Sequence, residues 1–187
     1  MMKSVQEKLL FLYKFTRHPG QIGSVTPSSV YLAQTMLQHV PWDEVKHLAE
    51  LGSGTGAITK HLSSKIHEDA KILLFEKDPQ LYSGLRRQYP DYPCYSDACR
   101  LQSAMKSEGI EELDCILSGL PFFNFPQQVR DQLMDQIIAS LRTGGLFIAF
   151  QYSQQMKRQL SERLEIEHIQ FVPMNLPPAF VYVCRKK

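Results

Sequence analysis

The sequence predicts an α/β domain with a mostly parallel β-sheet and helices on both of its faces. From about residue 46 onward, short apolar runs typical of buried strands alternate with segments of helical periodicity. Such alternation is typical of βαβ units, whose crossover helices cover the two faces of a parallel sheet. The length of 187 residues suits one domain, and a hydrophobic content of 43% is enough for a full core.

The apolar runs and turn residues place each element. Strands are expected at 45–51, 71–76, 93–96, 113–118, 146–151, 166–172 and 179–184, which makes a seven-stranded sheet. Helices are expected at 57–66, 79–89, 125–145 and 153–164, the second capped by Asp78 and opened by Pro79, the third ended by Gly144. Ligands of such sheets bind beyond the carboxyl ends of the strands, so the loops after the first, second and fourth strands should meet there.

Two helical segments precede the sheet. Residues 3–17 carry four Lys or Arg against one Glu, together with aromatic side chains, as an amphipathic helix at an anionic membrane surface would. The alternative is a helix packed on the domain with its charges in water. Thr26 and Pro27 are expected to open a second helix that runs to about His39. We therefore divide the chain into residues 1–40, which carry these two helical segments, and residues 41–187, the main domain.

Composition excludes several classes of protein. The formal net charge of +2 gives no global basic field of the kind many nucleic-acid-binding proteins carry. The four cysteines form no CxxC pair, which favours reduced thiols in a cytosolic protein, and neither they nor the six histidines show metal-ligand spacing. Apolar runs stay well short of the ~20 residues of a membrane span.

Three glycines at alternate positions follow the first predicted strand, in ELGSGTGA (50–57). Glycines allow a sharp turn and a close approach of the backbone to a ligand, and a following helix would point its amide groups at the site. Gly52, Gly54 and Gly56 also satisfy the dinucleotide-binding pattern, so alone they do not identify the ligand. Glu50 precedes them, and a carboxylate there suits a cationic ligand better than a pyrophosphate.

Two further acidic residues follow the next strands. Glu76 ends the second strand and could accept hydrogen bonds from both hydroxyls of a ribose, and Asp97 follows the third, where it could accept from an adenine amino group. Both could instead be strand-end or capping residues. Together with the absence of Lys and Arg from the glycine turn, these acids indicate a nucleoside that carries positive charge.

On these residues the sequence resembles the class I S-adenosylmethionine-dependent methyltransferases, with their Rossmann-like fold. ELGSGTG stands at the family's first motif, FEKDP (75–79) at its second and SDA (96–98) at its third. The resemblance implies S-adenosyl-L-methionine as cofactor and S-adenosyl-L-homocysteine as product. It implies that the cofactor is bound by Glu50, Gly52, Ser53, Gly54, Gly56, Glu76, Lys77, Asp97 and Ala98.

The stretch SGLPFFNFP (118–126) follows the fourth predicted strand, where amine-directed members of this family often have Asn-Leu-Pro-Tyr or Asn-Pro-Pro-Tyr. In that motif, oxygens orient the amine and an aromatic ring supports the cation that methylation creates. Gly119 occupies the Asn position, which favours a flexible aliphatic amine over a planar adenine. The resemblance assigns catalysis to Ser118, Gly119, Leu120, Pro121 and Phe122.

With GSVTPSS (23–29) and NLPPAFVYV (175–183), the same stretch resembles a narrower group, the small bacterial phospholipid N-methyltransferases. That resemblance implies stepwise methylation of phosphatidylethanolamine by a cytoplasmic protein, peripheral at the inner face of the cell membrane and bound to its anionic surface through residues 3–17. It also places residues 20–36 over the cofactor, which makes residues 1–40 the amphipathic helix and active-site lid and residues 41–187 the S-adenosylmethionine-binding domain.

Other functions stay open on the sequence. One is an RNA adenine N6-methyltransferase, although nucleic acid is an unexpected partner given Gly119 and the low net charge. Others are a methyltransferase of a soluble small amine, a dinucleotide-binding oxidoreductase, and a non-enzymatic membrane-associated module. The sequence names no general base and no oligomeric state.

Overall fold

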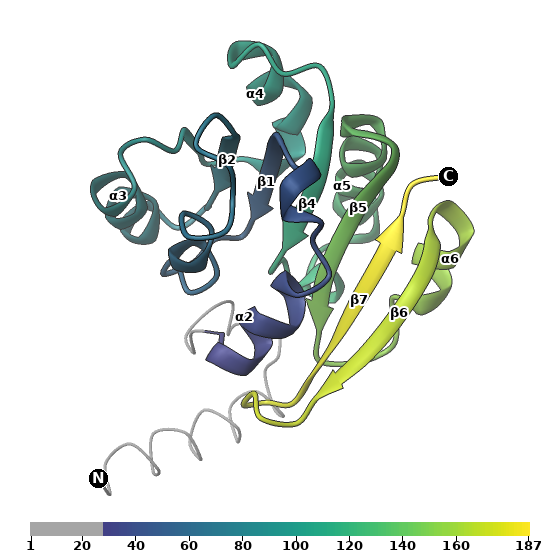
Figure 1. Ribbon diagram of the computed structural model, residues 1–187. Coiled ribbons are helices and arrows are strands. Elements are labelled where there is room, and N and C mark those ends of the chain that lie inside the picture. The colour runs from purple at the N-terminus through teal and green to yellow at the C-terminus, as the bar shows by residue number, and fades with distance from the viewer. Residues whose placement is uncertain (1–27) are drawn as a thin grey trace, which may run out of the picture.

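A seven-stranded sheet with the order β3-β2-β1-β4-β5-β7-β6 forms the centre of the computed structural model, which describes residues 28–187 (Figure 1). Its strands are His47–Leu51 (β1), Lys71–Phe75 (β2), Cys94–Tyr95 (β3), Leu113–Ser118 (β4), Leu141–Gln151 (β5), Glu165–Val172 (β6) and Ala179–Arg185 (β7). Only β7 runs antiparallel to its neighbours, β5 and β6. The predicted mostly parallel, seven-stranded sheet is confirmed.

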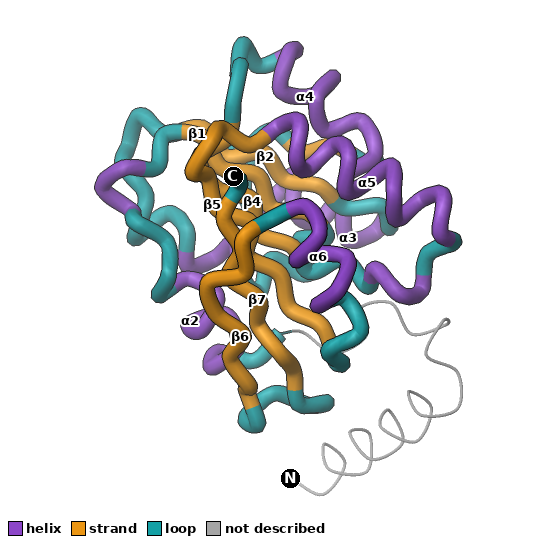
Figure 2. Tube along the Cα trace, turned by 90° about the vertical axis from the view of Figure 1, so that its right-hand side faces the viewer, coloured by secondary structure: helices purple, strands orange, loops and turns teal. Residues whose placement is uncertain are grey.

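Helices cover both faces of the sheet and divide the core into two clusters. The α-helices are Val30–Leu37 (α2), Pro79–Gln88 (α3), Leu101–Ser107 (α4), Gln127–Ser140 (α5) and Lys157–Arg163 (α6). Buried side chains of α4, α5 and α6 form one cluster with the sheet, and those of α2 and α3 form the other. Figure 2 shows the sheet separating α2 from α4, α5 and α6.

The predicted helix starts and ends are partly confirmed. Asp78 caps α3, where its carboxylate accepts from the amides of Gln80 and Leu81, both at 2.9 Å, and Pro79 is the first helical residue. The end predicted for α5 at Gly144 is wrong, because the helix stops at Ser140 and Leu141 already begins β5. Leu141 fits the helical spacing of apolar residues and the strand equally well.

The segment predicted as a helix at 57–66 forms turns and a short 3-10 helix at Thr59–His61. Its backbone bonds mostly join residues three apart, as from the amide of Leu62 to the carbonyl of Thr59 at 2.9 Å. The buried hydroxyl of Thr59 donates to the carboxylate of Glu50 in β1 at 2.8 Å. The glycine loop therefore leads into tight turns, and the expected α-helix dipole at the site is absent.

The chain before the sheet begins, among the described residues, at Ser28. Ser29 caps α2 by accepting from the amide of Leu32 at 3.1 Å, so the cap predicted at Thr26 is wrong, and the helix ends at Leu37. Thr26, Pro27 and the predicted basic segment 3–17 lie outside the described residues.

No helix within residues 28–187 combines the length and apolar character that a membrane span requires.

Candidate functional site

The loops after β1 and β4 lie side by side, because these two strands are parallel neighbours. The strand order changes direction between them, since β2 and β3 lie on one side of β1 and β4 and β5 lie on the other. Leu51 and Ser118, the last residues of β1 and β4, are partners in the sheet register, and the amide of Gly119 donates to the Leu51 carbonyl at 2.8 Å. A Cβ added at Gly119 would lie 3.0 Å from the carbonyl oxygen of Gly52. The predicted meeting of the glycine loop with SGLPFFNFP is confirmed.

All three glycines of the loop after β1 adopt left-handed backbone angles, with φ of 76° at Gly52, 58° at Gly54 and 78° at Gly56. Side chains are disfavoured in this region, so the sequence GxGxG is required by the turn itself. The amides of Gly52 and Ser53 both donate to the carbonyl of Phe75, at 2.8 and 2.9 Å. These bonds fix the start of the loop against the end of β2.

The Glu76 carboxylate joins the loops after β1 and β2. One oxygen, Oε2, accepts from the amide of Gly54, and the other, Oε1, accepts from the amide of Asp78, both at 2.8 Å. Glu76 is only 9% exposed. Because each carboxylate oxygen offers two lone-pair sites, the group keeps capacity to accept from the hydroxyls of a bound nucleoside.

Glu50 lies at the bottom of the same loop, in β1, and is 1% exposed. Its Oε2 accepts from the Thr59 hydroxyl at 2.8 Å, whereas its Oε1 has no hydrogen-bond partner among residues 28–187. The pKa of Glu50 is raised to about 8, mainly by burial and also by the charge of Glu76, while the hydrogen bond from Thr59 opposes part of this rise. A buried carboxyl with one unpaired oxygen fits a positively charged ligand, which would favour its ionised form.

The third predicted acidic residue has a capping role in the structure. Asp97 is exposed, and its Oδ1 accepts from the amide of Cys99 at 2.9 Å at the start of the 3-10 helix Ala98–Arg100. Lys77 is exposed and Ala98 is half-buried. These residues follow β2 and β3, so they lie at the same end of the sheet as the glycine loop.

The loop after β4 is held from inside the protein. The hydroxyl of Ser118, which is fully buried, accepts from the amide of Leu120 at 3.3 Å. Phe122 is also fully buried, with its ring edge-on to Phe147 at a centroid distance of 6.3 Å. Phe122 thus packs in the core, while Phe123 beside it is 39% exposed. Contact of Phe122 with a substrate stays a prediction.

Two residues of β5, which the sequence did not single out, position this loop. Gln151 is 7% exposed, and its Nε2 donates to the carbonyl of Leu120 at 2.8 Å. A Cβ at Gly119 would also lie 3.3 Å from Cε1 of Phe150. The available signal was a glutamine at the end of the predicted strand 146–151, which is otherwise apolar, since a buried amide requires partners.

Asn175, in the loop between β6 and β7, connects that loop to α2. The residue is 5% exposed, its Oδ1 accepts from the amide of Ser29 at 3.0 Å, and its Nδ2 donates to the Pro177 carbonyl at 2.7 Å. NLPPAFVYV therefore supports the start of α2, and GSVTPSS ends at the same point. The lid role predicted for residues 20–36 stays a prediction.

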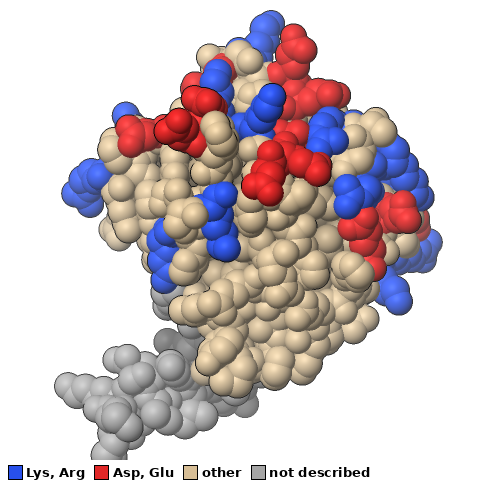
Figure 3. Space-filling view, viewed as in Figure 1, with Lys and Arg blue, Asp and Glu red and all other residues tan. Residues whose placement is uncertain are grey.

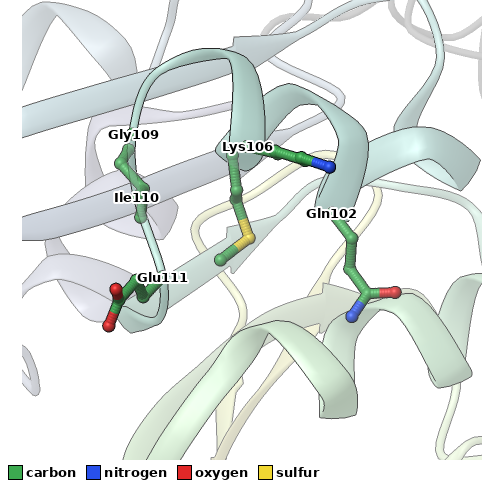
Figure 4. Close-up of a pocket in the computed structure, with 6 residues that line it drawn as sticks. Gln102, Lys106, Gly109, Ile110 and Glu111 are labelled. Carbon is green, nitrogen blue, oxygen red and sulfur yellow. The ribbon is translucent and has the colours of Figure 1, made fainter.

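The surface hollow in Figure 4 is not part of this site. It is lined by residues of α4 and of the segment that leads into β4, namely Gln102, Met105, Lys106, Gly109, Ile110 and Glu111. These residues precede β4, whereas Gly119 follows it, so the hollow lies at the opposite end of the sheet.

Among residues 28–187, no group of three or more His, Cys, Asp or Glu side chains is placed to hold a metal ion.

Comparison with known proteins gives a relative along nearly the whole chain. The ornithine lipid N-methyltransferase of Singulisphaera acidiphila is 32% identical over 187 residues, which covers 97% of each protein. No family model matches the sequence.

Solved structures share the fold at lower identity. The N-methyltransferase NodS from Bradyrhizobium japonicum, in complex with S-adenosyl-L-homocysteine, is 13% identical with a TM-score of 0.64 over 84% of this chain and 88% of its own. A TehB-like SAM-dependent methyltransferase from Corynebacterium glutamicum is 16% identical with a TM-score of 0.61 over 97% and 99%. TrmN from Thermus thermophilus is 20% identical with a TM-score of 0.65 over 91% and 52%.

The glycine turn and the buried carboxylates of Glu50 and Glu76 fit a cationic nucleoside cofactor, and the sheet is that of the methyltransferase structures above. The chain belongs to the class I S-adenosylmethionine-dependent methyltransferases, in the family of the ornithine lipid N-methyltransferase of Singulisphaera acidiphila, and S-adenosyl-L-methionine is its cofactor.

Proposed function

We propose that this methyltransferase acts on the amine of a membrane lipid headgroup, with phosphatidylethanolamine and its mono- and dimethylated forms as the first candidates. The observation that carries the proposal is the full-length relationship to a protein named for methylating the amine of a lipid. The sequence SGLPFFNFP, which resembles the phospholipid N-methyltransferases, supports the same class of substrate.

The residues proposed to hold the cofactor are those of the glycine turn, together with Glu50, Glu76, Lys77, Asp97 and Ala98. When bound, S-adenosyl-L-methionine supplies a methyl group on a positively charged sulfur. Glu76 would accept from the ribose while it keeps the Gly54 amide in place, at 2.8 Å. Glu50 would face the positive charge of the ligand, which supplies a reason for burying a carboxyl with an unpaired oxygen.

The amine substrate would be oriented by the loop after β4, toward the adjacent glycine turn. The carbonyl of Leu120 already accepts from the Phe122 amide at 3.0 Å and from Gln151 at 2.8 Å. We therefore assign the amine N–H groups to the carbonyl of Gly119, with Ser118, Pro121 and Phe122 fixing the loop. Orientation of the amine in line with the departing sulfur can lower the barrier to such a displacement by up to about 7–11 kcal/mol.

An aliphatic amine fits this loop better than an adenine does. A side chain at position 119 would meet the Gly52 carbonyl at 3.0 Å, so the loop offers a backbone carbonyl and no amide side chain there. An ornithine lipid headgroup is the second candidate, on the strength of the relative's name. Its amine and that of phosphatidylethanolamine share the chemistry that the loop would recognise.

We further propose that the protein works at the cytoplasmic face of the membrane, with the predicted basic segment 3–17 on the anionic surface and residues 20–36 closing the site. The charge pattern of residues 3–17 supports the contact. Closure would exclude water from the transferred methyl group.

Transfer of radiolabelled methyl groups from S-adenosyl-L-methionine tests the proposal. Separate reactions receive liposomes with phosphatidylethanolamine, liposomes with ornithine lipid, total RNA, and soluble ethanolamine. We expect label in one or both lipid extracts and in no other fraction. Label confined to RNA or to the soluble amine would contradict the proposal, and the Glu76→Gln variant serves as a control for background transfer.

A further inference from the structure

Large apolar side chains reach the surface at few places in residues 28–187. The exposed ones are Val30 at 48%, Tyr31 at 54%, Phe123 at 39%, Phe171 at 53% and Met174 at 63%. The guanidinium of Arg130 lies over the Phe123 ring at 5.0 Å and partly covers it. We call the other four, Val30, Tyr31, Phe171 and Met174, the apolar rim.

The apolar rim lies at the end of the sheet where the glycine turn lies. β6 runs in the same direction as β5, because both are antiparallel to β7. Phe171, near the end of β6, pairs with Phe180, which in turn pairs with Gln151 at the end of β5. Gln151 holds the loop after β4. Phe171 is therefore level with the site across the sheet.

The start of α2 completes the rim. The hydrogen bond of 3.0 Å between the Ser29 amide and Asn175 brings Val30 and Tyr31 to the loop that carries Met174. The chain enters the described structure at Ser28, directly beside these residues.

No charged side chain belongs to the segments that build this end around α2 and β5–β7. Residues 28–42, 118–129, 143–156 and 169–184 contain no Lys, Arg, Asp or Glu. In Figure 3 the charged residues gather toward the top and sides, and the lower part of this face, over the lower ends of β5, β6 and β7, carries none. An exposed apolar patch without charges favours a contact that removes it from water.

We propose that the apolar rim docks on a phospholipid bilayer, as a membrane contact separate from residues 3–17. The proposal rests on the proposed function, because an amine that belongs to a membrane lipid must reach the loops after β1 and β4 from the bilayer surface. A rim beside those loops aims the site at the headgroups. Tyr, Phe and Met side chains suit the boundary between headgroups and acyl chains. The rim carries no carboxylate that anionic lipids would repel.

Binding to vesicles of phosphatidylcholine and phosphatidylethanolamine tests the docking with the full chain. These lipids carry no net charge, so the electrostatic contribution of the basic segment is small, and its apolar contribution is the same in every variant. We expect the double variant Phe171→Glu/Met174→Glu to bind roughly tenfold more weakly than the wild-type protein, since apolar burial at the rim is lost. Thr143→Glu, an exposed position at the other end of the sheet, should leave the affinity unchanged. Equal thermal unfolding of the variants confirms that they fold.

Insertion is measured separately with Met174→Trp and Thr143→Trp, using vesicles with brominated acyl chains. Quenching of the first variant beyond that of the wild-type protein, with none added in the second, supports docking. Equal vesicle binding by the double variant and the control overturns it. So does a change in oligomeric state of the double variant without loss of vesicle binding, since the rim would then contact protein.

Activity on a water-soluble short-chain phosphatidylethanolamine separates this inference from the proposed function. If only docking is lost, the double variant methylates the soluble lipid at the wild-type rate. If the wild-type protein methylates no lipid amine, the proposed function fails, while the vesicle results still decide whether the rim contacts a bilayer.

Discussion

The carboxylate of Glu76 accepts the amide of Gly54 at 2.8 Å, so the end of β2 holds the middle glycine of the loop after β1. Its second oxygen accepts the amide of Asp78, also at 2.8 Å, which opens α3. One side chain therefore fixes two of the loops that are proposed to hold the cofactor. This arrangement explains why an acidic residue stands at the end of β2.

Glu76→Gln should weaken binding of S-adenosyl-L-homocysteine at least tenfold. An amide can accept with its oxygen alone, so its NH2 group would face one of the two backbone N–H donors, and a charge-assisted hydrogen bond of about 1.5–3 kcal/mol would be lost. Isothermal titration calorimetry measures the affinity, with the exposed Glu68→Gln as the matched control. Unchanged affinity in Glu76→Gln would remove Glu76 from the cofactor site.

Glu50 should make the folded protein less stable as pH rises. Its folded pKa of about 8 lies above its ordinary value of 4.5, so between these values the folded state holds a proton that the unfolded state has released. The contribution of Glu50 to stability is complete below pH 4.5 and is lost as pH rises toward 8, by at most about 1.4 kcal/mol per pH unit.

Urea denaturation of the wild-type protein and Glu50→Gln at several pH values measures this contribution. We expect the free energy of unfolding to fall less steeply between pH 5 and 8 in Glu50→Gln, which cannot titrate. Glu68→Gln should keep the wild-type dependence. Parallel curves for the wild-type protein and Glu50→Gln would show that Glu50 has an ordinary pKa.

Gly119→Ala should destabilise the protein by about 1–3 kcal/mol, the usual cost of overpacking. The added methyl group would lie 3.0 Å from the Gly52 carbonyl oxygen and 3.3 Å from the Phe150 ring. Gly84→Ala, inside α3, is the matched control. A Cβ there meets nothing within 4 Å, and we expect a gain of roughly 0.5–1 kcal/mol.

Chemical denaturation of both glycine variants decides between two reasons for the missing side chain at position 119. Loss of stability in Gly119→Ala supports close packing of the two loops. Wild-type stability together with lost activity would show instead that position 119 is kept open for the substrate.

Gln151→Leu should impair methyl transfer while the affinity for S-adenosyl-L-homocysteine stays at the wild-type value. The substitution removes the donor to the Leu120 carbonyl, a bond of 2.8 Å, and lets the loop after β4 shift. A displaced acceptor loop of this kind typically lowers the rate by about a hundredfold. Steady-state kinetics measures the rate of methyl transfer, and calorimetry measures the affinity for S-adenosyl-L-homocysteine. A weakened affinity would place Gln151 with the cofactor.

Short-range patterns were enough to predict the sheet. Buried strands such as Lys71–Phe75 are mostly continuous apolar runs, and the cap of α3 is formed within three residues. α4 was not predicted, because LQSAMKS is short and half polar. The turns after Ala57 were predicted as a helix because their apolar residues are helically spaced, while the bond from Thr59 to Glu50 joins positions nine apart.

The part of the site that a local sequence pattern determines, the backbone of the glycine turn, could be predicted. The positive φ angles of the glycine turn are implied by GxGxG, whereas the contact of Gly119 with Gly52 and Phe150 depends on three separate strands. Sequence could not show which of the neighbouring phenylalanines points inward. The structure buries Phe122 and leaves Phe123 partly exposed.

Lipid analysis of cells tests the central claim most directly. The protein is expressed in cells whose membranes contain phosphatidylethanolamine but none of its methylated forms, and the extracted lipids are analysed by mass spectrometry. We predict mono-, di- or trimethylated phosphatidylethanolamine with the wild-type protein and a much smaller amount with Glu76→Gln. Unmodified lipids in cells that contain the folded protein, together with new methyl groups in RNA or a soluble amine, would contradict the account.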